Sequence, residues 1–523
     1  MKDRKKEIIA IIIVLIIQTV IFVIAGANKS YIHMDEAYSL GLANYDKVEI
    51  QDNEDFYNKW HNSEYYEDYL AVQDKDIGKF SQVYENQKND VHPPIYYLLL
   101  RIAMGTSLNH YSKWPGIILN IIIYGFITIF MYLILQKLFE GRKNYKEKSI
   151  ILALVSSITM ASITNAIYIR MYALSTLNIL IITYLHIKLL DSEKIDFKLL
   201  VAIGISALIG SLTHYYYLFY LAMLYIAFAI KYIKDKKYKN LIYYTVTMVI
   251  AGILSLAIFP YSIQHMFFGY RGQGVLSKLA DVKGFSESIK EYIKKVDRFS
   301  FNKLLGPIIL AIVIFIACKL FKKEKILSEK NKYIKYIILS TMFYFFLVAV
   351  ASPWIELRYI MPICGLIFVI VMFYFEETLC NLVSEKANDI IVSVTLIIVL
   401  LAPIAYKIEP EVMYSDKKEI VSKLENDLNV PALYLFNSNC NRFLDDILLF
   451  SILDESYVAK DINCTEENIQ NILQNKDISE GIIIFINEGQ ENDTLLQTIK
   501  NVTKFSNCTY LKRLNAADVY YLN

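Results

Sequence analysis

The stretch that decides the fold runs from Ile8 to Tyr38 and reads IIAIIIVLIIQTVIFVIAGANKSYIHMDEAY. Its first part, Ile8–Gly26, is apolar and long enough to cross a hydrocarbon core of about 30 Å, which needs about 20 helical residues. Two carboxylates, Asp35 and Glu36, follow closely after it. The stretch therefore predicts a membrane helix with ionisable groups at its rim, where such groups are functional candidates.

A cleaved signal peptide is the alternative interpretation of this first segment. The basic residues before it (Lys2, Arg4, Lys5 and Lys6) and the small residues Ala25-Gly26-Ala27 after it fit a cleavage site. Its apolar part, however, is longer than the usual stretch of about 7–15 residues, which favours a retained anchor. Both alternatives leave the residues that follow outside the cytoplasm.

Composition excludes an ordinary soluble enzyme. Of 523 residues, 55% are hydrophobic, with 41 Tyr and 28 Phe. A formal net charge of +2 gives no basis for a nucleic-acid partner. Six cysteines in a chain of this length do not make a disulfide scaffold, and the three late ones (Cys440, Cys464 and Cys508) allow at most one bridge among themselves.

About eleven apolar stretches are expected to cross the membrane as helices, because open backbone cannot face lipid. They are Ile8–Gly26, Pro115–Phe139, Ser149–Tyr168, Tyr172–Leu190, Leu199–Thr213, Tyr215–Ile233, Leu241–Tyr261, Leu304–Leu320, Tyr333–Ser352, Leu357–Phe375 and Ile390–Tyr406. The closely joined pairs around Arg170 and His214 leave the exact number open.

Lysine and arginine in the loops predict the orientation, because short cytoplasmic loops are enriched in them. Clusters of basic residues follow the second, sixth and eighth spans. They comprise Arg142, Lys143, Lys146, Lys148, Lys231, Lys234, Lys236, Lys237, Lys239, Lys319, Lys322, Lys323, Lys325, Lys330, Lys332 and Lys335. The N-terminus is then cytoplasmic, and the acidic loop 27–93 and the C-terminal region are extracytoplasmic. The outer loop Gln264–Lys303 breaks this pattern, either as a solvated amphipathic segment or as a cationic flap over lipid phosphates.

Two domains are expected, a polytopic α-helical domain at 1–406 and a small extracytoplasmic α/β domain at 407–523. In the second, short apolar runs at 431–436, 456–459, 481–486 and 518–521 predict strands, and helical spacing occurs between them. This domain shows no glycine-rich phosphate loop and no nucleophile elbow. Its role is open, with scaffolding or acceptor docking as possibilities.

A second motif, Asp90-Val91-His92-Pro93-Pro94, stands before the next apolar stretch. The two prolines exclude helical geometry at His92 and start a helix at Ile95. The helix at 95–105 is too short to cross, so we expect it to lie in the membrane interface and to hold Asp90 and His92 beside Asp35. A polar helix flank is the ordinary alternative for Asp35-Glu36, and a structural hydrogen bond is the alternative for His92.

Three cationic or titratable residues recur at the predicted outer helix ends: Arg170, His214 and Arg358. Each alone fits a snorkelling or capping side chain. Together on one face they indicate phosphate binding, because the planar fork of arginine donates two parallel hydrogen bonds to phosphate oxygens. A carboxylate opposite such cations suits a reaction that deprotonates a hydroxyl while a phosphate departs.

The chain resembles the GT-C superfamily of integral-membrane glycosyltransferases, in the branch of protein O-mannosyltransferase-like and aminoarabinose-transferase-like enzymes. The resemblance covers roughly Ile8 to Pro403. The residues that carry it are Asp35-Glu36-Ala37-Tyr38, Asp90-Val91-His92-Pro93-Pro94-Ile95-Tyr96-Tyr97, Arg170-Met171-Tyr172, Thr213-His214-Tyr215-Tyr216 and Arg358-Tyr359. The C-terminal domain resembles no family.

The resemblance implies a polyprenyl-phosphate sugar as donor and transfer with inversion to a hydroxyl-bearing acceptor at the extracytoplasmic face. Asp35 is then the general base, and Glu36 or Asp90 orients the acceptor or, as a lesser alternative, a divalent ion. The residues expected to contact the donor phosphate are His92, Arg170, His214, Arg358 and Tyr359. No cofactor and no bound metal are expected. The acceptor stays open, because loop 41–89 matches no known recognition pattern.

Three other classes are weighed against this one. A secondary transporter would show paired broken helices or repeated halves, which the sequence lacks. A polysaccharide polymerase or ligase also uses polyprenyl-linked sugars, but places its key residues in a large late loop, whereas the strongest motifs here precede residue 100. A non-catalytic membrane scaffold is the third alternative.

Overall fold

The computed structural model describes residues 2–192, 194–268, 282–326, 332–426, 429–440, 442–461 and 464–523. Its contacts divide the chain into two compact units. The first, which we call the helical unit, comprises Met1–Gly26, Asp90–Tyr96 and Ile117–Glu411. The second, the α/β unit, comprises Ala27–Asn89, Tyr97–Gly116 and Val412–Asn523. The first loop and the C-terminal region therefore belong to one compact unit.

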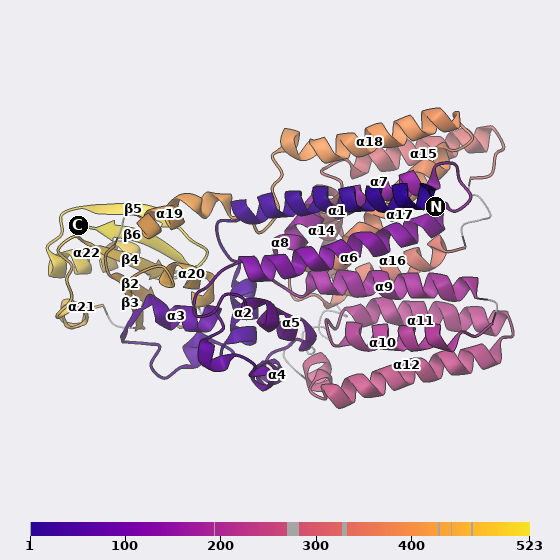
Figure 1. The fold of residues 1–523 in the computed structure, drawn as a ribbon. Coiled ribbons are helices and arrows are strands. Elements are labelled where there is room, and N and C mark those ends of the chain that lie inside the picture. The colour runs from indigo at the N-terminus through magenta and orange to yellow at the C-terminus, as the bar shows by residue number, and fades with distance from the viewer. Residues whose placement is uncertain are drawn as a thin grey trace. The chain divides into compact units, whose positions relative to one another are not determined.

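Eight helices of the described chain are long and apolar enough to cross a membrane, which confirms a multi-pass membrane protein. They are α1 (Lys2–Asn28), α6 (Trp114–Phe139), α9 (Tyr172–Asp191), α11 (Tyr217–Lys234), α12 (Tyr238–Ile258), α16 (Ile334–Ala351), α17 (Met361–Leu379) and α18 (Glu385–Tyr406). Each coincides with one of the expected stretches. Figure 1 shows α9, α11 and α12 running alongside one another in the helical unit.

The other three expected spans differ from a straight crossing. The stretch at 149–168 is two helices, α7 (Tyr145–Ser157) and α8 (Met160–Ile167), bent by 60°. Thr159 causes this break, because its side chain accepts a hydrogen bond from Ser162 N and caps a new helix. Helices α14 (Val282–Ser300) and α15 (Leu305–Phe321) meet at 95°, and α10 (Phe197–Ser211) is short. The described residues thus give eight to ten spans rather than eleven.

The loop Gln264–Lys303 is described only in part. A π-helical turn, η3 (Gln264–Phe268), begins it and α14 ends it. Residues 269–281 lie outside the described residues, so the cationic-flap alternative is not tested at Arg271 and Lys278.

Polar pairs between helices tie the interior of the helical unit together. Asn178 on α9 donates to Thr213 Oγ1 at 3.0 Å. Thr183 and Tyr220 share a buried hydroxyl–hydroxyl contact of 2.8 Å between α9 and α11. Such bonds hold helices together where lipid removes any hydrophobic preference for association. They connect α9 to Thr213, which directly precedes His214, and to α11.

The α/β unit contains a six-stranded sheet of order β1-β3-β2-β4-β6-β5. Its strands are β1 (Trp60–Asn62), β2 (Ala432–Phe436), β3 (Glu455–Lys460), β4 (Ile482–Asn487), β5 (Cys508–Arg513) and β6 (Ala517–Leu522). The three central strands, β3, β2 and β4, are parallel, and the others pair antiparallel. This confirms the expected small α/β fold of the C-terminal region. Strands β1 and β5 were not expected, and β1 comes from the first loop.

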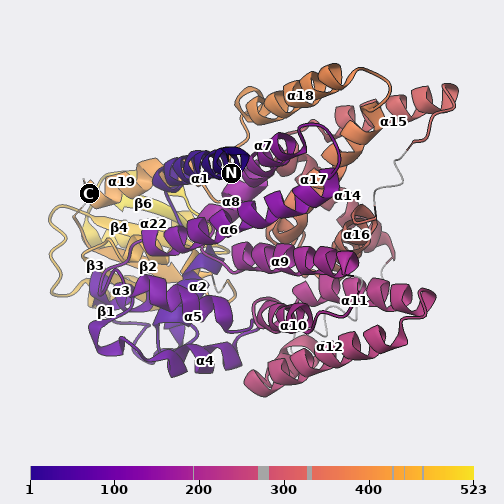
Figure 2. The same ribbon diagram turned by 45° about the vertical axis from the view of Figure 1, so that its right-hand side comes forward.

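Helices pack around this sheet and against the first loop. The C-terminal region supplies η6 (Phe443–Asp445) and helices α19 (Lys418–Asn426), α20 (Ile447–Phe450), α21 (Glu466–Leu473) and α22 (Asn492–Thr503). The first loop supplies α2 (Met34–Asn44), α3 (Ser63–Leu70) and α4 (Phe80–Asn89), and α5 (Ile95–Met104) follows them in the chain. Helix α3 lies beside β1 in Figure 2, and α2 contacts both α3 and α4.

The contacts between the first loop and the C-terminal region are largely aromatic. Phe443 packs edge-on against Phe56 with ring centroids 4.9 Å apart. Tyr66 Oη lies 2.7 Å from Ser456 Oγ, and both residues are buried. Trp60 Nε1 donates to Ile472 O at 3.1 Å. These contacts make the first loop an integral part of the α/β unit.

Candidate functional site

The second motif forms a close pair in the helical unit. His92 Nδ1 lies 2.7 Å from Asp90 Oδ2, and both side chains are largely buried. Pro93 and Pro94 separate them from α5, which starts at Ile95 as the prolines predict. Ile95 N donates to Leu212 O at 3.2 Å, so the motif is fastened next to the residues that lead into His214.

Asp90 is held as an anion. Burial raises its pKa, but the charge and hydrogen bond of His92, together with the charge of Arg170, outweigh burial and lower the pKa to about 2. A carboxylate with so low a pKa is a weak base. Asp90 therefore fits an orienting role better than a proton-accepting one.

His214 lies beside this pair. Its ring centroid is 6.4 Å from that of His92 and 5.4 Å from that of Tyr172. The His214 Nδ1 accepts a hydrogen bond from Tyr216 N at 3.1 Å, which orients the imidazole. Tyr216 in turn lies 5.8 Å, between ring centroids, from Tyr359. The structure thus brings five predicted site residues of the helical unit into one neighbourhood. They are Asp90, His92, Arg170, His214 and Tyr359.

A pocket of about 380 Å³ lies beside these residues; His92, His214 and Tyr359 line it, whereas Asp90 and Arg170 do not. It is lined by Val91, His92, His214, Tyr215, Tyr216, Leu218, Phe219, His265, Met266, Phe267, Ala351, Pro353 and Tyr359. Its walls are mainly apolar and aromatic, and three imidazoles face it. We call it the three-histidine pocket.

His265 was missed by the sequence analysis. It lies in the π-helical turn η3, where its Nδ1 is 2.9 Å from the Tyr215 hydroxyl. Single π-helical turns occur often at functional sites. The one available signal was its position just after the apolar stretch that ends at Tyr261, which was too general to single it out.

Arg358 is adjacent to the pocket but is not among its lining residues. It belongs to the 3₁₀ turn η4 (Leu357–Tyr359), and its guanidinium carbon lies 5.2 Å from the centre of the Tyr359 ring. Since Tyr359 lines the pocket, the arginine is one side chain away from it. Its expected contact with a donor phosphate stays a prediction.

Asp35 and Glu36 occupy the first turn of α2 in the α/β unit. His33 is the N-cap residue: its Nδ1 accepts from Asp35 N at 3.0 Å, and its own N donates to Glu36 Oε2 at 2.9 Å. This reciprocal capping box satisfies backbone donors that a helix start leaves open. Two acidic residues in the first turn also oppose the positive end of the helix dipole.

The two carboxylates have different surroundings. Lys29 Nζ lies 2.6 and 2.7 Å from the two Glu36 oxygens, and neither side chain is exposed to solvent. Asp35 keeps a 12% exposed side chain, with Oδ2 3.8 Å from His33 Nδ1. Glu36 is therefore engaged in a fully buried ion pair, whereas the Asp35 side chain keeps a small exposed fraction.

The eight predicted site residues are thus divided between the two units. Asp35 and Glu36 belong to the α/β unit and the other six to the helical unit. Convergence of all eight on one reaction centre stays a prediction. Within the described residues, no group of three His, Cys, Asp or Glu side chains is arranged to hold a metal ion.

Comparisons with known proteins add similarity at the level of the whole chain. No family model matches, and no curated protein matches. Solved structures do. Two of them are crystal structures of ArnT from Cupriavidus metallidurans, one bound to undecaprenyl phosphate (TM-score 0.49, 8% identity, 98% of this chain and 97% of that one) and one in the apo state (TM-score 0.42, 8% identity, 93% and 96%). At these values the matches assign no role to any residue of this chain.

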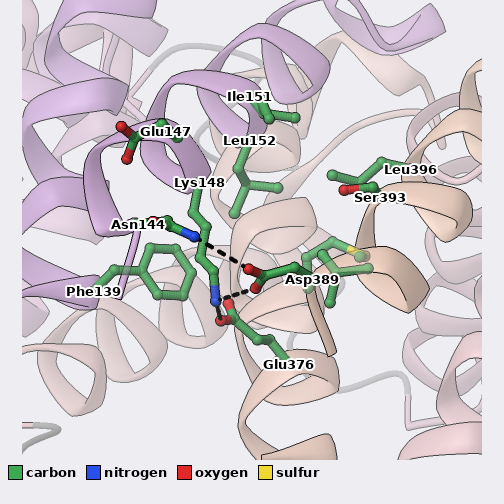
Figure 3. A pocket seen from close by; sticks show the side chains of 12 residues that line it. Phe139, Asn144, Glu147, Lys148, Ile151, Leu152, Glu376, Asp389, Ser393 and Leu396 are labelled. Carbon is green, nitrogen blue, oxygen red and sulfur yellow. Dashed lines mark hydrogen bonds and ion pairs between the residues drawn. The ribbon is translucent and has the colours of Figure 1, made fainter. Parts of the chain in front are cut away.

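A second pocket of the helical unit contains none of the predicted residues. It has a volume of about 380 Å³ and lies between α7, α17 and α18. Figure 3 shows Lys148 reaching between Glu376 and Asp389, with Nζ–O distances of 2.7 and 2.8 Å. These ion pairs connect α7 with both α17 and α18, so the cluster has a structural role.

Proposed function

We propose that this chain is a membrane glycosyltransferase that moves a sugar from a polyprenyl-phosphate donor to a hydroxyl-bearing acceptor. The three-histidine pocket carries the proposal. A polyprenyl phosphate combines a long apolar chain with an anionic head, and the pocket combines apolar walls with imidazoles beside the Asp90–His92 pair and Arg170. A ligand of either chemistry alone would need only one of these features.

On the donor side, each residue has a role that follows from its chemistry. Arg170 and Arg358 donate paired hydrogen bonds to phosphate oxygens, and His92 and His214 supply further donors. Asp90 stays ionised and fixes the His92 ring through Nδ1. Tyr359 places Arg358 next to the pocket.

On the acceptor side, Asp35 is the general base. It takes the proton of the acceptor hydroxyl, whose oxygen attacks the anomeric carbon from the face opposite the phosphate. The bond from that carbon to the phosphate oxygen breaks, and its electron pair leaves with the polyprenyl phosphate, so configuration inverts. Cationic donors stabilise the charge that develops on the leaving phosphate. The reaction takes place at the extracytoplasmic face.

The test compares Asp35→Asn with wild type in membranes supplied with a polyprenyl-phosphate sugar. Mass spectrometry of surface glycans and glycoproteins, with and without this chain, first identifies the sugar and the acceptor. Loss of the base should lower the transfer rate by at least about 100-fold. Gel filtration and thermal unfolding should match wild type, because the His33 cap of α2 contacts the backbone N–H of Asp35, which the substitution keeps. Normal transfer by this variant would contradict the assignment of Asp35 as the general base.

Arg358→Ala separates phosphate binding from proton transfer. We expect a higher KM for the donor and a nearly unchanged rate at saturating donor. Arg4→Ala, which removes an exposed arginine at the start of α1, serves as the matched control. An unchanged donor KM in Arg358→Ala would remove Arg358 from the phosphate site.

A further inference from the structure

A polar groove of about 670 Å³ lies within the first loop of the α/β unit. It is lined by Tyr45, Asp46, Asn53, Asp68, Gln73, Lys75, Asp76, Lys79, Ser81, Gln82 and Glu85. Its volume is within the range of about 300–1,000 Å³ that is typical of ligand sites. We call it the polar groove.

Buried hydrogen bonds hold the walls of the groove. Arg101 is 2% exposed and donates to the carbonyl oxygens of Ala43, at 2.7 Å, and Asp76. Asn86 is 4% exposed and donates to Tyr45 O at 2.8 Å. These bonds connect α2, α4 and α5 beneath the groove. The site is therefore preorganised, which lowers the entropy cost of binding.

The lining residues are suited to sugar hydroxyls. All of them carry hydrogen-bonding side chains, among them three amides, a serine hydroxyl and a tyrosine ring, and none is a large aliphatic residue. The three-histidine pocket has the opposite character, with mainly apolar walls. A lipid chain fits the pocket, and a polyhydroxylated ligand fits the groove.

The charge of the groove selects further among such ligands. Four carboxylates (Asp46, Asp68, Asp76 and Glu85) stand against two lysine ammonium groups (Lys75 and Lys79). One ammonium is already paired, since Lys79 Nζ lies 2.7 Å from Asp76 Oδ1. Burial, and then the neighbouring carboxylates Asp76, Asp46 and Glu64, raise the pKa of Asp68 against the opposing effect of Lys75. A cationic group on the ligand would relieve this repulsion.

Helix α2 joins the groove to the candidate base. Asp35 lies in its first turn, and Tyr45 and Asp46 follow its last residue. Eleven residues of α-helix span about 16 Å. A short oligosaccharide is long enough to cover this separation, which is all that the length of α2 shows because most of the helix itself is buried.

We propose that the polar groove binds the glycan portion of the acceptor, and that it prefers glycans carrying amino groups over those carrying acids. The identification of this glycan as the acceptor rests on the proposed function. The binding of the glycan to the groove does not depend on it.

The test measures binding to the full chain in lipid nanodiscs with three tetrasaccharide probes, one cationic, one neutral and one anionic. They are the tetrasaccharides of glucosamine, N-acetylglucosamine and galacturonic acid. We expect affinity to fall in that order. Asp46→Asn combined with Gln82→Ala should weaken glucosamine tetrasaccharide binding about tenfold, as expected for the loss of two polar contacts. Glu54→Gln, an exposed carboxylate of the same loop outside the lining, is the matched control.

Two results would overturn the inference: no saturable binding of any probe, or equal binding by the double variant and wild type. The proposed function fails separately, if wild type neither binds polyprenyl phosphate nor transfers sugar from it. The double variant should bind polyprenyl phosphate as tightly as wild type does. A loss there would show general misfolding of the variant, and Asp46→Asn alone, at an exposed position, would then repeat the comparison.

Discussion

At the residue scale, the ion pair between Lys29 and Glu36 gives Glu36 a surrounding different from that of the neighbouring Asp35. The pair is fully buried, and Glu36 also accepts the His33 backbone N–H at the start of α2. Glu36 thereby fixes the turn on which Asp35 stands. Geometry near a reacting centre is set by such supporting groups as much as by the reacting group itself.

Lys29→Met should destabilise the α/β unit by about 3–5 kcal/mol, because it leaves the Glu36 carboxylate buried without its counter-charge. The double variant Lys29→Met, Glu36→Met should recover much of this loss, since an apolar pair of similar size replaces the buried charges. Thermal and denaturant unfolding in detergent measure both. Lys59→Met, which opens the exposed pair with Asp55, should change little. A double variant as unstable as the single one would contradict the interpretation.

The depressed pKa of Asp90 predicts a specific pH dependence. A carboxyl whose folded-state pKa of about 2 lies below its ordinary 3.8 contributes stability above the higher value and loses it as pH falls through the lower one. The contribution is about 2 kcal/mol. The difference in unfolding midpoint between wild type and Asp90→Asn should shrink as the pH falls below about pH 4. A difference that stays unchanged down to about pH 2 would contradict a carboxylate origin.

At the element scale, the three-residue strand β1 decides the boundary of the α/β unit. It pairs antiparallel with β3 and places Trp60 opposite Tyr457. Without it, β3 would be an open edge strand, which is a template for aggregation. The first loop therefore covers an edge of the sheet that the C-terminal region forms.

A fragment containing only residues 412–523 should accordingly be less stable than the same region within the full chain, and should associate through β3. Co-expression with residues 27–116 should reduce both effects, because it restores β1 and the aromatic contacts of Phe56 and Tyr66. Limited proteolysis and light scattering measure the outcome. A monomeric, protease-resistant fragment would show that the sheet needs no partner from the first loop.

The sequence identified the spans well and their interruptions poorly. Apolar length alone predicts a crossing, because the lipid core requires it, and eight stretches agree with helices of the structure. The break before Met160 depends on one capping threonine within an apolar run, which pattern reading does not detect. Strand β1 has too few residues to show any periodicity, and its partner lies far along the chain.

The candidate site was predictable to the extent that its residues form local motifs. Asp90, His92 and the proline-started helix follow from neighbours in sequence, and the structure shows their pairing. His265 could not be found that way, because only the folding of η3 places it at the pocket. The buried partner of Glu36 was also missed, since Lys29 lies seven residues away across an irregular segment.

At the scale of the whole molecule, the candidate site features are distributed over two units. The helical unit carries the pocket suited to a lipid phosphate, and the α/β unit carries Asp35 and the polar groove. All six cysteines, which lie within the described residues, are free, so no disulfide joins or braces either unit.

The loop charges predict that the α/β unit faces the outside of the cell. In a background without native cysteines, Glu480→Cys should react with a membrane-impermeant maleimide in intact cells. Lys143→Cys, in the lysine-rich loop after α6, should react only after permeabilisation. Both positions are exposed. Mass spectrometry of the labelled protein reads out the result, and the reverse pattern would invert the topology.

The pairing of the first loop with the C-terminal region has a consequence for biosynthesis. Tyr66 and its hydroxyl partner Ser456 are 390 residues apart. At a synthesis rate of about 5–20 residues per second, the loop waits roughly 20 to 80 seconds before its partner strand exists. During that interval its tyrosine and tryptophan side chains have no sheet to cover them. Production of this protein should therefore depend on translation speed and on chaperones that hold the unfolded loop.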